Sequence, residues 1–288
     1  MKYQFIEDHR DQYPVTLMCR LLAVARSGYY EWRKQPLSAQ KMANLLLLMH
    51  IQDIFVESRE TYGSYRIHAE LAEQGLGCGR KRVARLMRSY NLIPKTVRTF
   101  KVVTTDSKHN LPVAPNRLNQ QFSADGPDQI WLTDITYIPT SEGWLYLAVV
   151  LDLYSRRIVG WAMSDSLHRQ VVIDALQMAI TIRQPPPGLL HHSDRGSQYA
   201  SDDYQALLTE KRMIGSMSRK GNCYDNAPLE SFFGTLKTEL VFHQHYATRA
   251  EARLDIFEYI EVFYNRFRRH SALGYKSPVK FEALPLGA

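Results

Sequence analysis

Three acidic residues stand in sequence contexts that suit metal-dependent chemistry. Asp134 interrupts the apolar segment 131–137, where a carboxylate is costly to desolvate unless a cation compensates it. Asp194 follows a short apolar segment and precedes Arg195-Gly196, and Glu230 lies on a predicted helix. Each acid alone also fits an ordinary structural role, namely a frayed strand edge, a turn before glycine and an exposed helix face.

Taken together, the three carboxylates form a ligand set for a hard divalent cation. Mg²⁺ prefers oxygen ligands and keeps waters and substrate phosphate oxygens in its coordination shell. Two ions about 3.5 to 4 Å apart can activate the attacking oxygen and stabilise the leaving oxygen in phosphodiester chemistry. Lys237 lies two turns after Glu230 on the same helix face, from which it would reach a neighbouring phosphate.

A mixed α/β layer is predicted to position these acids. Residues 130–138 are rich in Ile, Trp, Thr and Tyr, which indicates a strand, and turn signals at Gly143 and Ser155-Arg156 favour antiparallel connections to two more strands. Alternating helices and strands follow, and a capping box at Thr248 and Glu251 predicts the start of the last helix. The further predicted strands are 144–153, 157–163, 188–193 and 213–217, and the predicted helices are 168–182, 202–211, 226–241 and 250–268.

This arrangement predicts where each acid lies in the fold. Asp134 is on the first strand, and Asp194 is at the carboxyl end of a later strand, where open α/β sheets gather ligands. Glu230 is on the helix that closes the sheet. The three carboxylates are therefore expected to converge on one edge of the sheet.

The pattern of the first hundred residues predicts short helices, and one of these helices is strongly basic. In residues 79–90 the apolar positions recur at helical spacing, while Lys81, Arg85 and Arg88 fall on another side. No acidic residue lies between Arg80 and Phe100 to pair with these cations. We predict that Lys81, Arg85 and Arg88 enter a DNA groove from a recognition helix that follows a helix over 65–71. A solvated basic face is the alternative, and residues 16–34 fit either a helix-turn-helix or an ordinary helical hairpin.

Charge divides the chain into a basic front and an acidic middle. Residues 1–100 contain 16 Lys and Arg against 9 Asp and Glu, whereas residues 121–240 contain 10 against 14. This asymmetry favours a part that binds a polyanion, because Lys and Arg supply most of the non-specific affinity for nucleic acid. We predict a helical DNA-binding region over 1–100, a proline-containing linker over 101–125, a catalytic core over 126–245 and a C-terminal helical extension over 246–288.

Composition also indicates where the protein works. The longest apolar run is far shorter than the roughly 20 residues that span a bilayer, and the first residues do not resemble a signal peptide. The three cysteines are scattered and never in C-x-x-C spacing, which favours reduced thiols over disulfides or a zinc cage. A cytoplasmic protein without membrane contact is expected.

Three sequence blocks carry a resemblance to a known family. They are Trp131-Leu-Thr-Asp-Ile-Thr-Tyr137, His191-His-Ser-Asp-Arg-Gly-Ser-Gln-Tyr199 and the stretch from Gly221 through Glu230 to Phe233. They look like the catalytic blocks of insertion-sequence transposases of the OrfB type in the insertion sequence three family. The 35 residues between Asp194 and Glu230 match that family's D-D-35-E spacing. Residues 59–66 and 264–274 are similar to its upstream DNA-binding module and its C-terminal block.

The resemblance implies a retroviral-integrase-like core with a ribonuclease H-like five-stranded mixed sheet flanked by helices. It implies that Asp134, Asp194 and Glu230 bind two Mg²⁺ ions, or Mn²⁺ in their place, and that Lys237 contacts DNA near the scissile phosphate. The expected reaction cleaves the ends of the element and joins a 3′-hydroxyl to target DNA. The resemblance also leads us to expect a homo-oligomer on DNA, an upstream DNA-binding protein fused by frameshifting, and a location on the bacterial nucleoid.

Two other functions fit parts of the sequence. A DNA-binding regulator without catalysis would explain the basic region but not the three acids. A ribonuclease H-type nuclease that cuts RNA in hybrids would share the core but not explain the basic helical region before it. His191 and His192 could help shape the metal site, with a structural role as the commoner alternative. Arg266, Arg268 and Arg269 end the last predicted helix, where they suit the helix dipole and could also contact DNA.

Overall fold

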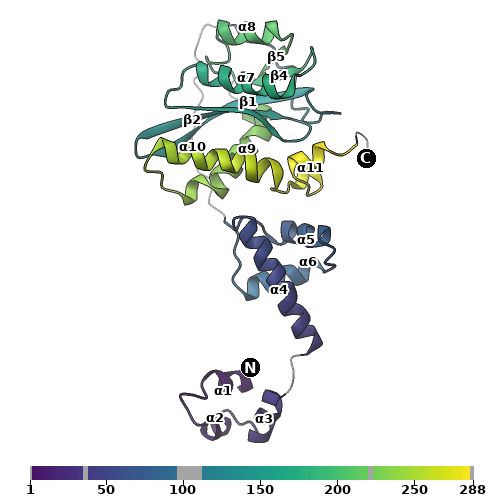
Figure 1. The fold of residues 1–288 in the computed structure, drawn as a ribbon, viewed down its shortest axis with the longest axis vertical. Helices are drawn as coiled ribbons and strands as arrows, with labels where there is room; N and C mark the ends of the chain where they lie inside the picture. Colours follow the sequence, from purple (N-terminus) through teal and green to yellow (C-terminus); the bar gives the residue numbers. More distant parts are fainter. Residues whose placement is uncertain (1, 35–37, 96–111, 220–222, 286–288) are drawn as a thin grey trace. The chain divides into compact units, whose positions relative to one another are not determined.

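The computed structural model describes residues 2–34, 38–95, 112–219 and 223–285, and the chain forms two compact units, Met1–Asp53 and Ile54–Ala288 (Figure 1). The first unit contains α1 (Lys2–Asp8), α2 (Val15–Leu21) and α3 (Arg26–Lys34), whose apolar side chains pack around Ile6 and Tyr29. The Tyr29 hydroxyl donates a hydrogen bond to Glu7. Helix α4 (Ala39–Glu57) runs across the division between the units.

Helices α5 (Ser64–Glu73) and α6 (Arg80–Ser89) belong to the second unit. The turn between them contains Gly75 at a φ of 77°, a left-handed conformation that glycine adopts easily. The apolar face of α6 is buried through Val83, Leu86 and Met87, whereas Tyr90, which the periodicity grouped with them, is 48% exposed because the helix ends before it. The helical prediction for this region is confirmed.

The sheet has five strands in the order β3-β2-β1-β4-β5 (Figure 1). Strand β1 pairs antiparallel with β2, which pairs antiparallel with β3, and β1, β4 and β5 are parallel neighbours. The mixed α/β fold is therefore confirmed, with strand ends within two residues of those predicted. The strands are β1 (Ile130–Thr140), β2 (Gly143–Asp152), β3 (Ile158–Ser164), β4 (Leu190–Ser193) and β5 (Ile214–Met217).

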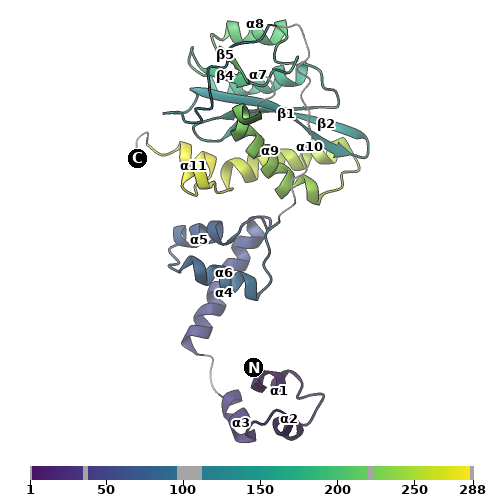
Figure 2. The same cartoon turned by 180° about the vertical axis from the view of Figure 1, so that it is seen from behind.

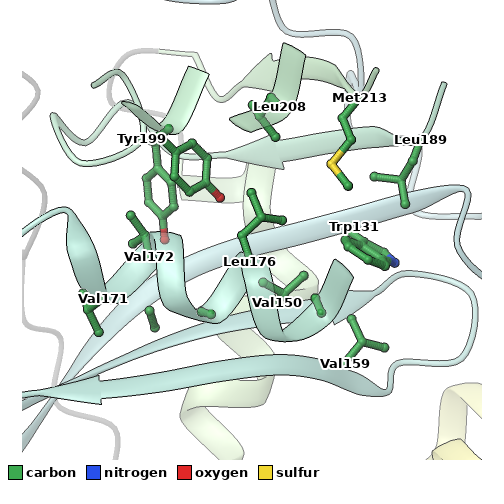
Figure 3. Close-up of a cluster of buried hydrophobic side chains, with 14 of the residues drawn as sticks. Trp131, Val150, Val159, Val171, Val172, Leu176, Leu189, Tyr199, Leu208 and Met213 are labelled. Atoms are coloured by element: carbon green, nitrogen blue, oxygen red, sulfur yellow. The ribbon is translucent and has the colours of Figure 1, made fainter. Parts of the chain in front are cut away.

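Helices cover both faces of the sheet. Helices α7 (Gln170–Arg183) and α8 (Asp202–Glu210) lie on one face, and α9 (Ala227–Glu239) and α10 (Arg249–Glu258) lie on the other (Figures 1 and 2). Figure 3 shows the core beneath α7, where Trp131 and Val150 of the sheet face Leu176. Because these apolar faces must be buried against one another, the sheet and its helices form a rigid base for the site.

The C-terminal segment departs from its prediction in one place. The capping box at Thr248 and Glu251 is present and starts α10. A single α-helix was expected over 250–268. The observed segment is α-helical as far as Glu258 and then π-helical over Tyr259–Tyr264. Three 3-10 segments, Cys223–Asn226, Val241–His243 and Ser271–Leu273, and helix α11 (Pro278–Glu282) complete the fold.

The structure describes only the later part of the predicted linker, because residues 101–111 lie outside the described residues. Its later part packs on the core: Leu118 is 2% exposed, and the Arg117 amide donates to Ser216 Oγ at 2.9 Å. Among the described residues no helix is both long and apolar enough to cross a bilayer.

Candidate active site

Strand β1 positions Asp134 beside the end of β4. Leu132 of β1 is level with His192 of β4, and continuing this parallel register by two residues places Asp134 level with Asp194. Trp131 and Ile135 face the core beneath α7, so the alternation of a strand turns Asp134 toward the face that α9 covers. Asp134 Oδ1 accepts a hydrogen bond of 2.8 Å from the Ile135 amide.

Asp194 is shaped by the turn that follows β4. Its Oδ1 accepts a hydrogen bond of 2.8 Å from the Gly196 amide, which fixes the side chain at the end of the strand. The Arg195 guanidinium donates to the Ser218 carbonyl at 2.6 Å and so ties this turn to the segment after β5. Both aspartates therefore lie at the carboxyl-terminal edge of the paired segment of β1 and β4, in the middle of the sheet.

Helix α9 brings Glu230 to the same edge. Its N-cap residue, Asn226, donates a hydrogen bond of 3.2 Å from Nδ2 to the carbonyl of Thr133, the residue before Asp134. Glu230 lies one turn into the helix and its side chain is exposed. The bond between Asn226 and Thr133 thus anchors the start of α9 on the strand that carries Asp134.

The charges of these groups act on one another. Burial and the negative charge of Asp194 raise the pKa of Asp134 well above its ordinary value, and Glu230 adds to this effect. The Ile135 amide and the Lys237 ammonium act in the opposite direction. Burial lowers the pKa of Lys237, while Asp134 opposes that shift. Three acids and one lysine therefore share a single electrostatic site with an excess of negative charge.

The donor set fits a hard cation by its chemistry. The negative charges of Asp194 and Glu230 act on the buried Asp134, and a divalent cation relieves this repulsion. Within the described parts of the chain, no three His, Cys, Asp or Glu side chains are gathered as tightly as metal ligands. Glu230 is the exposed member and has three rotatable side-chain bonds, so it is the acid with the most freedom to complete such a set.

Sequence reasoning overlooked Asp225, which lies in the block before Glu230 and is fully buried. Its carboxylate accepts hydrogen bonds from the Arg219 guanidinium at 2.8 and 3.1 Å, from Asn116 at 2.9 Å and from Gln120 at 3.0 Å. These bonds, that from Arg219 above all, hold the pKa of Asp225 well below its usual range. A charged residue inside a catalytic block was the only signal in the sequence, because two of its partners, Asn116 and Gln120, are distant in the chain.

His191 and His192 are buried in β4 and are satisfied by neighbours in the fold. The Tyr204 hydroxyl is 3.0 Å from His191 Nε2, and His192 lies 2.9 Å from Ser216 Oγ and 3.1 Å from Ser218 Oγ. Burial lowers the pKa of His191 to about 3 and that of His192 to about 4. Both rings are therefore neutral packing groups that join β4 to the elements beside it.

The basic residues separate into an exposed set and a buried set. Lys81, Arg85 and Arg88 project outward from α6, opposite its buried face. Arg268 and Arg269, considered from the sequence as DNA contacts, are each 4% exposed. They are engaged by glutamates: Glu239 pairs with Arg268, and Glu70 and Glu73 pair with Arg269. The buried pair stabilises the fold, whereas the exposed three can meet a ligand.

Family models match most of the chain. The model described as integrase core domain matches residues 124–223, a second integrase core domain model matches residues 230–286, and an HTH-like domain model matches residues 43–100.

Individual proteins match over almost the full length. The chain is 50% identical over 264 residues to the insertion element IS600 uncharacterized 31 kDa protein of Shigella sonnei, covering 92% of this chain and 97% of that protein. It is 46% identical over 284 residues to transposase InsF for insertion sequence IS3A of Escherichia coli (strain K12), covering 98% of each. Among solved structures, a simian T-cell lymphotropic virus intasome in complex with PP2A regulatory subunit B56 gamma is 17% identical, with a TM-score of 0.48, over 77% of this chain and 72% of that one.

Proposed function

The chain belongs to the IS3 family of insertion-sequence transposases, and we propose that Asp134, Asp194 and Glu230 are the acids with which it cleaves and joins DNA. It is a DDE transposase, a polynucleotidyl transferase with an integrase core and an HTH-like DNA-binding domain. The convergence of the two aspartates on one sheet edge, with α9 anchored there by Asn226, is the observation that carries the proposal.

Enzymes with this core use divalent metal, and we assign Mg²⁺, replaceable by Mn²⁺, to Asp134, Asp194 and Glu230. A pair of such ions supplies Lewis acidity at the attacking and leaving oxygens of a phosphodiester. The chain's own contribution is to anchor the start of α9 on β1 through Asn226, to orient Asp194 through the Gly196 amide, and to place Lys237 near Asp134, whose charge opposes the lowering of the Lys237 pKa by burial. Lys237 then holds a phosphate next to the one that reacts.

The DNA-binding role of the basic helix belongs to the same proposal. Lys81, Arg85 and Arg88 lie on the exposed face of α6 within the HTH-like domain, where they bind the element's ends. We retain residues 1–100 as the DNA-binding region, 101–125 as the linker, 126–245 as the catalytic core and 246–288 as its extension. Three statements remain predictions from the family resemblance: a homo-oligomer on DNA, a frameshift-fused upstream protein, and a cytoplasmic location on the nucleoid.

The assignment is tested by comparing Asp134→Asn with Asp165→Asn, which alters an exposed aspartate just after β3. With Mg²⁺ and a duplex that ends in the element's terminal repeat, Asp134→Asn abolishes nicking and strand transfer, and Asp165→Asn retains both. Without DNA, Mn²⁺ raises the melting temperature of the wild type and of Asp165→Asn but not of Asp134→Asn. Cleavage by Asp134→Asn at the wild-type rate would refute the assignment.

The melting temperature of Asp134→Asn in the absence of metal is an independent test of the assignment. Because burial and, after it, the negative charges of Asp194 and Glu230 raise the pKa of Asp134, ionised Asp134 destabilises the metal-free fold at neutral pH. The sign follows from linkage: an acid whose pKa is higher in the folded state loses stability as pH rises toward that pKa. Asp134→Asn removes this cost and therefore melts at a higher temperature than the wild type when metal is absent.

A further inference from the structure

A groove of about 480 Å³ runs alongside α9 within the second unit. One wall is formed by Ser231, Thr235 and Thr238, which lie on one face of α9. Thr61, Gly63 and Arg66, together with Lys95, line the rest of the groove. Hydroxyl groups and cationic side chains thus both line the groove, a combination that suits phosphate oxygens.

The charges that line the groove do not balance. Arg66, Lys95 and Arg268 contribute three positive charges, and Glu239 contributes one negative charge. Both oxygens of Glu239 are engaged by Arg268 at 2.7 Å, and Arg66 Nη1 is 3.8 Å from the same carboxylate. Burial lowers the pKa of Arg66, and the nearby positive charge of Arg268 lowers it further. Lys95 Nζ lies 3.9 Å from Glu60 Oε2, so Glu60 must be counted with Glu239. Three positive charges against two negative charges leave the groove one positive charge in excess, which an anion would neutralise.

Gly234 lies in the wall of the groove and has no role within the fold that requires glycine. A Cβ added there would meet no atom of the chain within 4 Å, and the residue has ordinary helical geometry. Glycine inside a helix is less stable than alanine, so the chain accepts a weaker helix at this point. Glycine suits a place where a ligand approaches the backbone closely.

The groove begins beside the candidate active site. Ser231 directly follows Glu230, and the seven residue steps from Ser231 to Thr238 span about 10 Å of helix. Glu230 and Lys237 directly precede Ser231 and Thr238, so they lie along the same length of α9 on the neighbouring face, and a strand held by them would run beside the groove.

We propose that this groove holds the phosphodiester backbone of the DNA strand that enters the active site, with Gly234 at its point of closest approach. The proposal rests on the proposed function for the location of the reacting phosphate. The hydroxyls of Ser231, Thr235 and Thr238 donate to phosphate oxygens from one wall, and Lys95 and Arg66 face the backbone from the rest of the groove. The segment Thr61–Arg66 thereby contributes directly to substrate binding in the core.

The first test replaces Gly234 by alanine. Because alanine favours the helix and meets no atom of the fold, Gly234→Ala raises the melting temperature by about 2 to 4 °C. Its methyl group faces the strand, so affinity for a fluorescent DNA duplex about 30 base pairs long, measured by anisotropy, falls several-fold. Stability and DNA affinity thus change in opposite directions, which a purely structural role for this position would not produce.

A second set of variants tests charge. Gly234→Glu places a negative charge in the groove and weakens binding of the same duplex about tenfold or more. Lys95→Ala removes one phosphate contact and reduces the slope of log affinity against log salt by about 0.9. Ile182→Glu adds the same charge to an exposed position on α7, across the sheet, and retains wild-type binding.

The outcomes separate this inference from the proposed function. All three groove variants retain the rise in melting temperature that Mn²⁺ causes in the wild type, because the acids are unchanged. Wild-type affinity and salt slope in Gly234→Ala, Gly234→Glu and Lys95→Ala would overturn the groove assignment, even if Asp134→Asn abolished cleavage. If Gly234→Glu fails to fold, Gly234→Ala and Lys95→Ala decide the question alone.

Discussion

Replacing Glu239 by glutamine removes one charge from the end of α9 while nearly preserving the volume of the side chain. The Glu239 carboxylate is 7% exposed and accepts two hydrogen bonds of 2.7 Å from Arg268, whose side chain is 5% exposed. The Tyr259 hydroxyl donates a third bond of 2.8 Å. Burial alone would lower the pKa of Arg268, but the attraction of Glu239 raises it overall, so this guanidinium depends on its partner.

Loss of the Glu239 charge leaves a buried arginine without its counter-ion. Breaking a buried pair by removing one partner costs about 3 to 5 kcal/mol, because the remaining charge stays desolvated. Glu258→Gln is the matched control, since it removes the same charge from a pair of similar length, 2.7 Å from Arg59, with side chains 28% and 55% exposed. An exposed pair contributes about 0 to 1 kcal/mol, so the two variants should differ by several-fold in the free energy of unfolding.

Urea denaturation followed by tryptophan fluorescence measures both variants, because Trp131, Trp144 and Trp161 all lie in the second unit. The Glu239→Gln midpoint falls strongly at low and at high salt, whereas the small Glu258→Gln effect vanishes at high salt because exposed charges are screened. Equal losses of stability in the two variants, or a loss below about 1 kcal/mol for Glu239→Gln, would refute the reasoning from burial.

The remaining predictions concern DNA binding and acid stability. Simultaneous replacement of Lys81, Arg85 and Arg88 by alanine weakens DNA binding and reduces the salt slope by about 2.7 if each contacts a phosphate; unchanged binding by anisotropy would remove α6 from the interface. His270 has a pKa lowered to about 2 by burial and by nearby arginines, so its neutral form is favoured in the fold while the unfolded chain takes up a proton near pH 6.5. Stability is therefore lost as pH falls below 6.5, by up to about 1.4 kcal/mol per pH unit from this residue, and His270→Gln shows a shallower acid slope in urea titrations; parallel slopes in the two proteins would contradict it.

The parts of the fold that the sequence predicted are those whose causes are local. Alternating apolar residues and turn signals around Gly143 located the strands, and the side-chain pattern of a capping box located the start of α10. The π-helical segment Tyr259–Tyr264 was missed because Tyr259, Ile260, Phe263 and Tyr264 are all buried, and such spacing fits either helix. Periodicity of apolar residues does not register a change in the hydrogen-bonding pattern of the backbone.

The same distinction between local and distant causes applies to the residues of the candidate site. The aspartates could be placed from the sequence because Asp134 lies within a strand with a clear apolar pattern and Asp194 directly follows the end of another strand. The environment of Asp225 could not, since two of its partners, Asn116 and Gln120, are more than a hundred residues away. Arg269 was misjudged for a similar reason, because Glu70 lies 199 residues before it and no local pattern joins them.

Helix α9 connects these observations into one physical account. Like charges at the acids oppose their own convergence, so the helix that carries Glu230 must be held by other groups. At its start Asn226 bonds to β1 and Asp225 binds the neighbouring loops, and at its end Glu239 is fixed by Arg268. Because both ends of α9 are anchored, the exposed turn around Gly234 can stay accessible without displacing Glu230. A helix needs this arrangement if it must bind a DNA strand along its side and present a metal ligand from its first turn.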